Sequence, residues 1–350
     1  MNTHKCEKCG SSLFFNSATG QVQCKKCGAI SEVKITKDIN RHHIDLMASV
    51  IDTASKSVST KHCNSCGAIF TGENGVISDI CEYCGATLVI DFSKNGGMLP
   101  DACIPFAFDP KGAAERFIKH VKKQKFVSNS VKNKLNAVDV ESLYIPAYTF
   151  DADTTSSYDG EIYSTHEDRD GDRRTVYRKI KGTRNVIVKN AMIECSSKFS
   201  QAEFNEIKPY DTTQIRKFDQ SYILGYSVED SDREFNDIRK SAKLIIDSKV
   251  KNSILSQYSY DGVEYLHIDT AYNSVNYSYI ILPTYKIKYT YKNKEYTHSI
   301  NGQTGKVGGK LPLSGWKIFG FILSLIGGVG LFVLLIILMM GGFFNIWWKV

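Results

Sequence analysis

The chain has 350 residues, with 44 Lys and Arg against 37 Asp and Glu and a formal net charge of +7. This excess is small for the length, so the composition excludes a strongly polycationic nucleic-acid binder. Tyr and Phe number 19 and 18 while Pro numbers only 7, which favours β-rich structure in the globular part.

Two sets of four cysteines open the chain with identical spacing. In each set two Cys-x-x-Cys-Gly pairs are separated by fourteen residues, and the second set repeats the first 57 residues later. Four thiolates on one tetrahedral Zn²⁺ need two short knuckles joined by a hairpin, which this spacing supplies. We therefore predict two structural zinc ions, held by Cys6, Cys9, Cys24 and Cys27 and by Cys63, Cys66, Cys81 and Cys84.

These cysteines predict two zinc ribbons, small β modules at residues 1–35 and 61–92. The glycine after each second cysteine permits the tight, positive-φ turn of a knuckle. The alternative is a disulfide framework, but no secretory-signal pattern opens the chain, which favours zinc. Two filled sites lower the formal charge to about +3. Residues 36–60 are predicted to be a polar linker, with His42 and His43 solvated in it.

A central α+β domain with an antiparallel sheet is predicted over residues 98–310. Its first helix begins at the Asp109-Pro110 pair, and a second begins at the capping box Ser231-Asp232-Arg233-Glu234. A polar turn is predicted at residues 166–172. Strand patterns cover residues 142–152, 157–165, 174–181, 184–195, 263–270, 274–283, 284–292 and 295–300.

Basic residues crowd one face of the first predicted helix. The stretch from Lys111 to Lys134 holds eight Lys and Arg against the single acid Glu115. A solvated helix face is the first interpretation, contact with anionic lipid headgroups the second, and nucleic acid the third. The candidate membrane- or anion-contacting residues are Lys111, Arg116, Lys119, Lys122 and Lys123.

The C-terminal segment has the composition of a membrane span, because no charged residue occurs from Ile318 to Trp348. Residues 318–340 would form a helix of about 34 Å, enough to cross a hydrocarbon core of about 30 Å. Residues 341–350 are predicted to form an interfacial tail. Small residues at Gly320, Ser324 and Gly328 line one side of the helix. Self-association explains this stripe about as well as helix flexibility or chance in a Gly-rich span.

Charge predicts the orientation of the span. Lys306, Lys310 and Lys317 precede it and only Lys349 follows it, so the N-terminal domains should be cytoplasmic. Thiolate zinc ligands also favour a reducing compartment. The sequence therefore predicts a single-pass, tail-anchored membrane protein.

Several stretches in the same order resemble a known family. They are the four Cys-x-x-Cys-Gly knuckles, Leu143–Ala152, Tyr210-Asp211, Phe218-Asp219, Tyr222–Tyr226, Ile281–Tyr285 and Asn301–Val307, followed by the span. Over nearly its whole length the chain resembles bacterial membrane-anchored zinc-ribbon proteins, often labelled TFIIB-type zinc-ribbon proteins and sometimes loosely labelled primosomal replication helicases. The resemblance implies the architecture and carries over no catalytic residue.

No helicase motor is predicted. A P-loop needs Gly-x-x-x-x-Gly-Lys-Ser/Thr, but Ile300 stands five residues before Gly305, and Val307 follows Lys306 where the hydroxyl belongs. A hairpin turn at Asn301-Gly302 explains the segment better. Cys103 and Cys195 lie among apolar neighbours, which predicts buried side chains rather than nucleophiles.

The sequence predicts a non-enzymatic, membrane-tethered adaptor or scaffold that presents a cytoplasmic interaction platform to a protein partner. The alternative is a membrane-anchored nucleic-acid-binding protein that uses the first ribbon and the basic stretch at 111–134. With zinc counted, the first ribbon carries about +1 and the second about −5. Because phosphate binding depends on cations, this balance favours protein recognition over nucleic acid.

Overall fold

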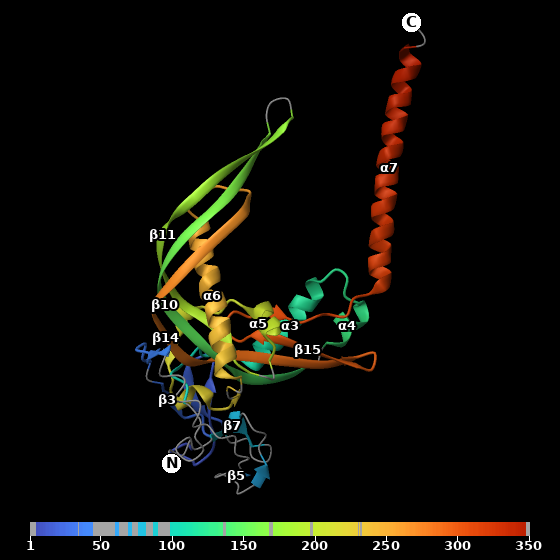
Figure 1. The fold of residues 1–350 in the computed structure, drawn as a ribbon. Helices are drawn as coiled ribbons and strands as arrows, with labels where there is room; N and C mark the ends of the chain where they lie inside the picture. Colours follow the sequence, from blue (N-terminus) through green and yellow to red (C-terminus); the bar gives the residue numbers. More distant parts are fainter. Residues whose placement is uncertain are drawn as a thin grey trace.

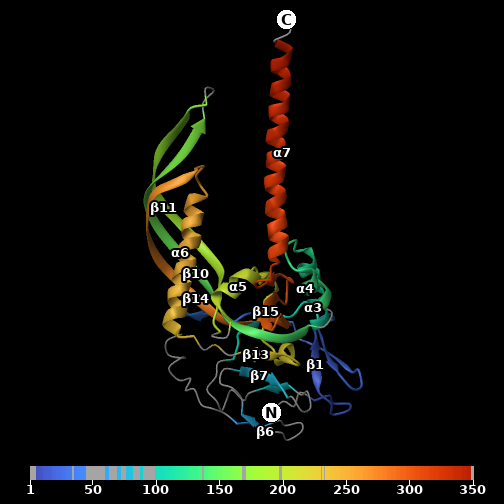
Figure 2. The same cartoon turned by 90° about the vertical axis from the view of Figure 1, so that its right-hand side faces the viewer.

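The computed structural model describes residues 5–33, 35–44, 60–62, 69–71, 76–81, 87–89, 99–135, 138–167, 171–196, 199–229, 231 and 233–347. Among them lie a small N-terminal sheet, a large curled sheet with helices against it, and one long C-terminal helix (Figure 1). A 90° rotation shows the same arrangement, with the N-terminal strands and the end of the C-terminal helix at opposite ends of the molecule (Figure 2).

Short antiparallel hairpins form the two cysteine-rich regions. In the first region, strands β1 (Leu13–Asn16), β2 (Gln21–Cys24) and β3 (Ile30–Glu32) form a three-stranded sheet. In the second, β5 (Thr60–His62) pairs with β6 (Ile69–Thr71), and β7 (Val76–Ile80) pairs with β8 (Thr87–Val89).

Three long strands dominate the central sheet. They are β10 (Asp139–Glu167), β11 (Arg173–Glu194) and β14 (Gly262–Tyr291), and β10 pairs antiparallel with each of the other two. The predicted breaks inside these strands are wrong. Thr154 and Ser156 are polar but fully buried. Thr154 Oγ1 donates a hydrogen bond to Val186 O, and Ser156 Oγ shares one with Thr270 Oγ1, both at 2.9 Å. Such pairing keeps a strand continuous where its apolar alternation fails.

Opposite charges face each other across the β10–β11 hairpin. Between Asp139 and Glu167, β10 contains Asp and Glu but no Lys or Arg, whereas β11 is rich in Lys and Arg. Lys181 Nζ lies 3.9 Å from Asp159, and Arg173 Nε lies 3.2 Å from Glu167. Cross-strand pairs of opposite charge stabilise one register over its neighbours. The polar turn predicted at 166–172 joins these strands; residues 168–170 lie outside the described part.

The half of the sheet nearest the ribbons is buried on both faces. On one face Leu143, Ile145 and Ala147 pack with α5 (Gln201–Ile207). On the other, Tyr144 and Tyr148 join the larger core. Shorter elements complete this half: β4 (His42–His43), β9 (Ala102–Cys103), β12 (Arg216–Lys217), β13 (Ser227–Glu229), β15 (Lys294–Asn301), β16 (Val307–Gly308), and 3₁₀ turns at Thr212–Gln214 and Gln220–Ile223.

Helix α6 (Phe235–Leu255) covers one face of the other half. It buries Ile238, Ala242, Ile246, Val250 and Ile254. The predicted capping box is wrong, because α6 begins after Glu234, which makes no side-chain cap. Arg233 instead donates to Glu194 O at 2.9 Å and holds the preceding chain against β11. A capping box does occur at α5, between Ser200 and Glu203.

The remaining helices connect the core to the C-terminus. Helix α3 (Pro110–Lys123) begins as predicted, since Asp109 Oδ1 accepts from Gly112 N at 2.8 Å. It is followed by α4 (Asn129–Lys134) and, after β16, by α7 (Gly315–Trp347). The predicted turn after Asn301 is confirmed, because β15 and β16 pair antiparallel across it and Gly305 has φ +77°.

Residues 36–44 of the predicted linker lie along the central sheet. Arg41 NH1 is 3.1 Å from Asp151 Oδ2, and Asn40 O accepts from Ser278 Oγ at 2.6 Å. His42 pairs with Asp101 at 2.8 Å while its side chain stays 39% exposed, so it is only partly solvated, whereas His43 is exposed as predicted. Residues 45–59 lie outside the described residues.

Candidate metal centre and apolar helix

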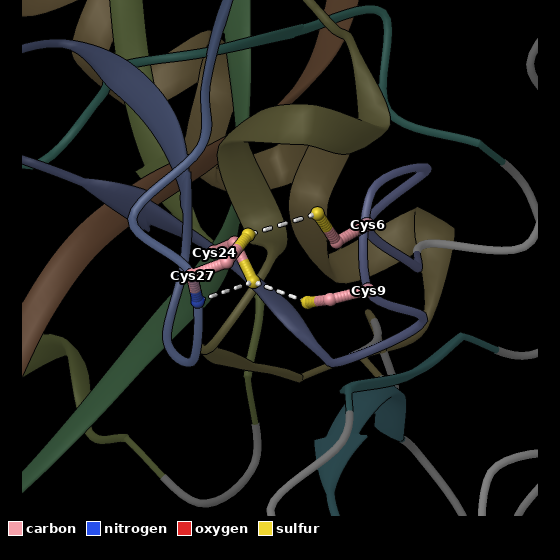
Figure 3. A group of neighbouring side chains, drawn as sticks. All are labelled: Cys6, Cys9, Cys24 and Cys27. Carbon is pink, nitrogen blue, oxygen red and sulfur yellow. Dashed lines mark hydrogen bonds between the residues drawn. The ribbon is translucent and has the colours of Figure 1, made fainter.

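Four cysteine sulfurs converge at the N-terminus, as the spacing predicts (Figure 3). Sγ atoms of Cys6, Cys9, Cys24 and Cys27 all lie within 4.8 Å of one another. Cys6 Sγ is 3.5 Å from Cys27 Sγ, and Cys9 Sγ is 3.4 Å from Cys24 Sγ. A tetrahedral Zn²⁺ with bonds of about 2.3 Å places its sulfurs about 3.8 Å apart. The cluster therefore has the size of one zinc site.

The two knuckles have the backbone that the sequence predicts. Gly10 and Gly28 have φ of +67° and +70°, and their amides donate to Cys6 O and Cys24 O. A Cβ at either glycine would meet no atom within 4 Å, so a larger residue would fit. Glycine is favoured because the positive φ angle is strained for other residues. Each knuckle is closed by paired backbone, through the Lys5–Ser12 bridge and the β2–β3 pair.

The electrostatics of the cluster favour a bound dication. The Cys27 amide donates to Cys24 Sγ and lowers the pKa of that thiol to about 6. At Cys27 the Ala29 backbone favours the thiolate, but the three neighbouring cysteines outweigh it and raise the pKa to about 12. Four thiolates so close repel one another unless a cation lies between them. The donor set and its spacing fit Zn²⁺.

Three ligands of the second predicted site, Cys63, Cys66 and Cys84, lie outside the described residues. Cys81 is described and is 1% exposed. The hairpins β5–β6 and β7–β8 bracket the two Cys-x-x-Cys segments of this set, as the paired backbone does in the first ribbon. One four-cysteine metal-binding group is thus present in the described part, at the first set.

The first ribbon is docked on the central domain. Phe15 is 3% exposed, and its ring meets that of Tyr222 edge-on at 5.3 Å. Phe15 N donates to Leu224 O at 2.9 Å, and Tyr226 OH donates to Phe15 O at 3.3 Å. Phe15 and Val22 belong to the same hydrophobic core as the long strands. Two consecutive phenylalanines, Phe14 and Phe15, in so small a ribbon are the sequence signal that could have predicted this docking.

The second cysteine-rich region is also continuous with the central sheet. β7 pairs antiparallel with β13, with Val228 opposite Ser78. β13 in turn pairs with β10, so the sheet order runs β14-β10-β13-β7-β8. Both cysteine-rich regions are therefore joined to the central domain through backbone hydrogen bonds.

The basic candidates on α3 do not act as one group. Arg116 is exposed but lies over Phe108, with its guanidinium 4.0 Å from the Phe108 ring centroid and NH1 3.2 Å from Gly112 O. Lys111 lies at the start of α3. Lys119, Lys122 and Lys123 lie nearer its end, where they line an open hollow of about 490 Å³ with Glu115 and Ile118.

Helix α7 is long and apolar enough to cross a membrane. Its stretch from Gly315 to Val333 has a mean hydropathy of 1.9 and is not buried against the rest of the molecule. The helix continues to Trp347, so residues 341–347 of the predicted interfacial tail are helical. In the small-residue stripe, Ser324 Oγ donates to Phe321 O at 2.7 Å within the helix.

The two cysteines outside the knuckles are buried, as predicted. Cys103 and Cys195 are both fully buried. Burial raises the pKa of the Cys103 thiol far above its usual range, with a smaller contribution from Asp219. A catalytic cysteine needs the opposite shift.

Comparison with known proteins gives a relative over nearly the full length. The chain is similar to the "Uncharacterized protein YdjG" of Bacillus subtilis (strain 168), with 27% identity over 348 residues that cover 98% of this chain and 99% of the relative. No protein-family model matches the chain. No solved structure matches it either.

Proposed function

We propose that this protein is a membrane-tethered zinc-ribbon adaptor, with α7 in the bilayer and the ribbons offered to a protein partner in the cytoplasm. One observation carries the proposal. The N-terminal strands that carry the four-cysteine cluster and the C-terminal end of α7 lie at opposite ends of the molecule, and these strands are hydrogen-bonded to the domain from which α7 leaves (Figures 1 and 2). A rigidly docked ribbon therefore projects away from the membrane surface.

The proposal includes a second zinc ion on Cys63, Cys66, Cys81 and Cys84. Supporting it are the repeated spacing, the two hairpins that bracket the cysteine pairs, and the burial of Cys81. Both ions have four thiolate ligands and no open position for water, so their role is structural. Membership of the TFIIB-type zinc-ribbon family is part of the same proposal.

A cytoplasmic, single-pass topology follows from the lysines that flank α7. Lys306, Lys310 and Lys317 precede the apolar stretch. Positive residues accumulate on the cytoplasmic side of a span. The reducing cytoplasm also keeps eight thiolates available for zinc.

We propose a binding role rather than catalysis. The acidic side chains Asp153, Asp159 and Glu161 are spread along β10, with Asp153 and Asp159 about 20 Å apart at 3.3 Å per residue. Asp159 pairs with Lys181 across the hairpin. These carboxylates do not converge on one point.

Nucleic-acid binding is the second candidate, and one observation favours it. Lys8, Lys25 and Lys26 lie inside the two knuckles, and all three are exposed. Lysines at a zinc knuckle can contact phosphates directly. The thiolate–zinc group beside them carries about −2, which weakens this surface and leaves protein recognition as the better explanation.

Site-specific photo-crosslinking in intact cells tests the adaptor role. A photoreactive residue at Lys8 is expected to capture one discrete protein at least fivefold more efficiently than the same residue at Lys251, an exposed control position on α6. Cys9→Ser should abolish the capture, because it dismantles the knuckle. Equal capture at both positions would contradict the proposal. Crosslinks to nucleic acid that Lys25→Glu/Lys26→Glu removes would favour the second candidate instead.

A further inference from the structure

The first turns of α7 are held by the turn between α3 and α4. Val127 and Leu313 form an isolated β-bridge, and Ser314 N donates to Phe126 O at 2.8 Å. Lys317 Nζ donates to Val127 O at 2.8 Å and to Asn129 Oδ1 at 2.7 Å. These contacts bring the end of α3 to the point where the apolar helix begins.

A further contact reaches into the apolar stretch itself. The Phe126 ring meets the Phe321 ring edge-on, with centroids 5.3 Å apart. Phe321 lies two turns into α7. Because these contacts involve only the first two turns, they hold the α3–α4 turn beside the N-terminal end of the apolar helix.

Exposed cations surround this junction. Lys119, Lys122, Lys123 and Lys125 at the end of α3 are exposed, and Lys310 is exposed on the approach to α7. Within the described part of the chain, none of these five lysines forms an ion pair with a carboxylate. Their charges are therefore available to an external anion.

Apolar side chains at the same level are exposed as well. Trp316 is 84% exposed and Leu313 is 63% exposed, beside the hydrogen-bonded Lys317. Tryptophan and lysine together at the end of a span are typical of the headgroup region, where the ring and the ammonium both find partners.

We infer that the end of α3, the α3–α4 turn and the first turns of α7 form one surface that binds anionic phospholipid headgroups. This inference depends on the proposed membrane span. It assigns anionic lipid as the partner of part of the basic stretch. Lys119, Lys122, Lys123 and Lys125 belong to the lipid-binding surface, whereas Arg116 stacks on Phe108 and does not. Each lysine near an anionic membrane strengthens binding about fivefold.

Spin-labelled lipids test the inference in the full-length protein. The protein is reconstituted in phosphatidylcholine vesicles with a trace of spin-labelled phosphatidylglycerol or phosphatidylcholine, and the motionally restricted fraction of each label gives their relative association constants. We expect at least a fivefold preference for phosphatidylglycerol at low salt. Lys122→Glu/Lys123→Glu should reduce this preference to near unity.

A matched double charge reversal keeps the test specific. Lys217→Glu/Arg239→Glu changes two exposed cations on β12 and α6 by the same total charge, and it should leave the preference unchanged. Equal binding of the two lipids by the native protein, or a preference that survives Lys122→Glu/Lys123→Glu, would overturn the inference. Failure of the membrane span itself would appear separately, as release of the native protein from membranes by alkaline carbonate.

Discussion

Replacing Phe15 by alanine is expected to destabilise the central domain, not the first ribbon alone. The free energy of unfolding should fall by about 3–5 kcal/mol, the usual cost of removing a buried Phe, and Tm by about 10 °C. The reason is that the buried Phe15 ring fills the junction between ribbon and domain and packs edge-on against Tyr222. The measurement is thermal unfolding of the purified protein, with amide hydrogen exchange read at β14.

A control in the same ribbon separates docking from ribbon folding. Ile30 lies on β3 and is 58% exposed, so Ile30→Ala should change the free energy of unfolding by less than about 1 kcal/mol. Chelation of zinc should act like Phe15→Ala, because the knuckles hold the strands that carry Phe15 and Val22. If neither zinc chelation nor Phe15→Ala changed the amide hydrogen-exchange rates of β14, the ribbon would be an independent module and the docking would be refuted.

Ending the chain after Phe321 is expected to release the protein from membranes almost completely. The shortened chain keeps the contacts of Lys317 and Phe321 with the α3–α4 turn but loses most of the apolar stretch from Gly315 to Val333. About 20 apolar residues are needed to cross the hydrocarbon core, and the seven that remain of α7 cannot do so. Fractionation with an alkaline carbonate wash measures the outcome.

Cys9→Ser/Cys27→Ser is the matched control for this truncation. It dismantles the first zinc site but leaves α7 intact, so the full-length variant should stay in the washed pellet. The proposed tether would be contradicted if carbonate removed the native chain, or if the shortened chain remained with the membranes.

Local patterns predicted the cysteine cluster and most element types. Spacing and the following glycines were enough for Cys6, Cys9, Cys24 and Cys27, because a knuckle is formed by neighbours in the chain. The same holds for the Asp109 cap of α3 and the turn after Asn301. In each case the determining contacts span only a few residues.

Long-range pairing was not predictable in the same way. The continuity of β10 and β14 depends on buried hydroxyl pairs such as Ser156 with Thr270, which are 114 residues apart. The start of α6 depends on Arg233 reaching Glu194 O, and the position of His42 depends on Asp101. These partners become neighbours only after the sheet has formed, so no local pattern identifies them.

The basic stretch at 111–134 illustrates the same limit within the candidate site. Its composition predicted an exposed cationic helix, and Lys119, Lys122 and Lys123 do form an exposed group. Composition could not show that Arg116 folds back onto Phe108. Nor could it show that Val127 meets Leu313 at the start of α7, because this contact joins segments almost 190 residues apart.

The zinc content of the purified full-length protein tests the central claim most directly. Two four-thiolate sites predict about two zinc ions per chain by elemental analysis, falling to about one in Cys6→Ser/Cys9→Ser. A native protein with essentially no zinc, whose eight knuckle thiols react freely with an alkylating reagent, would contradict the account.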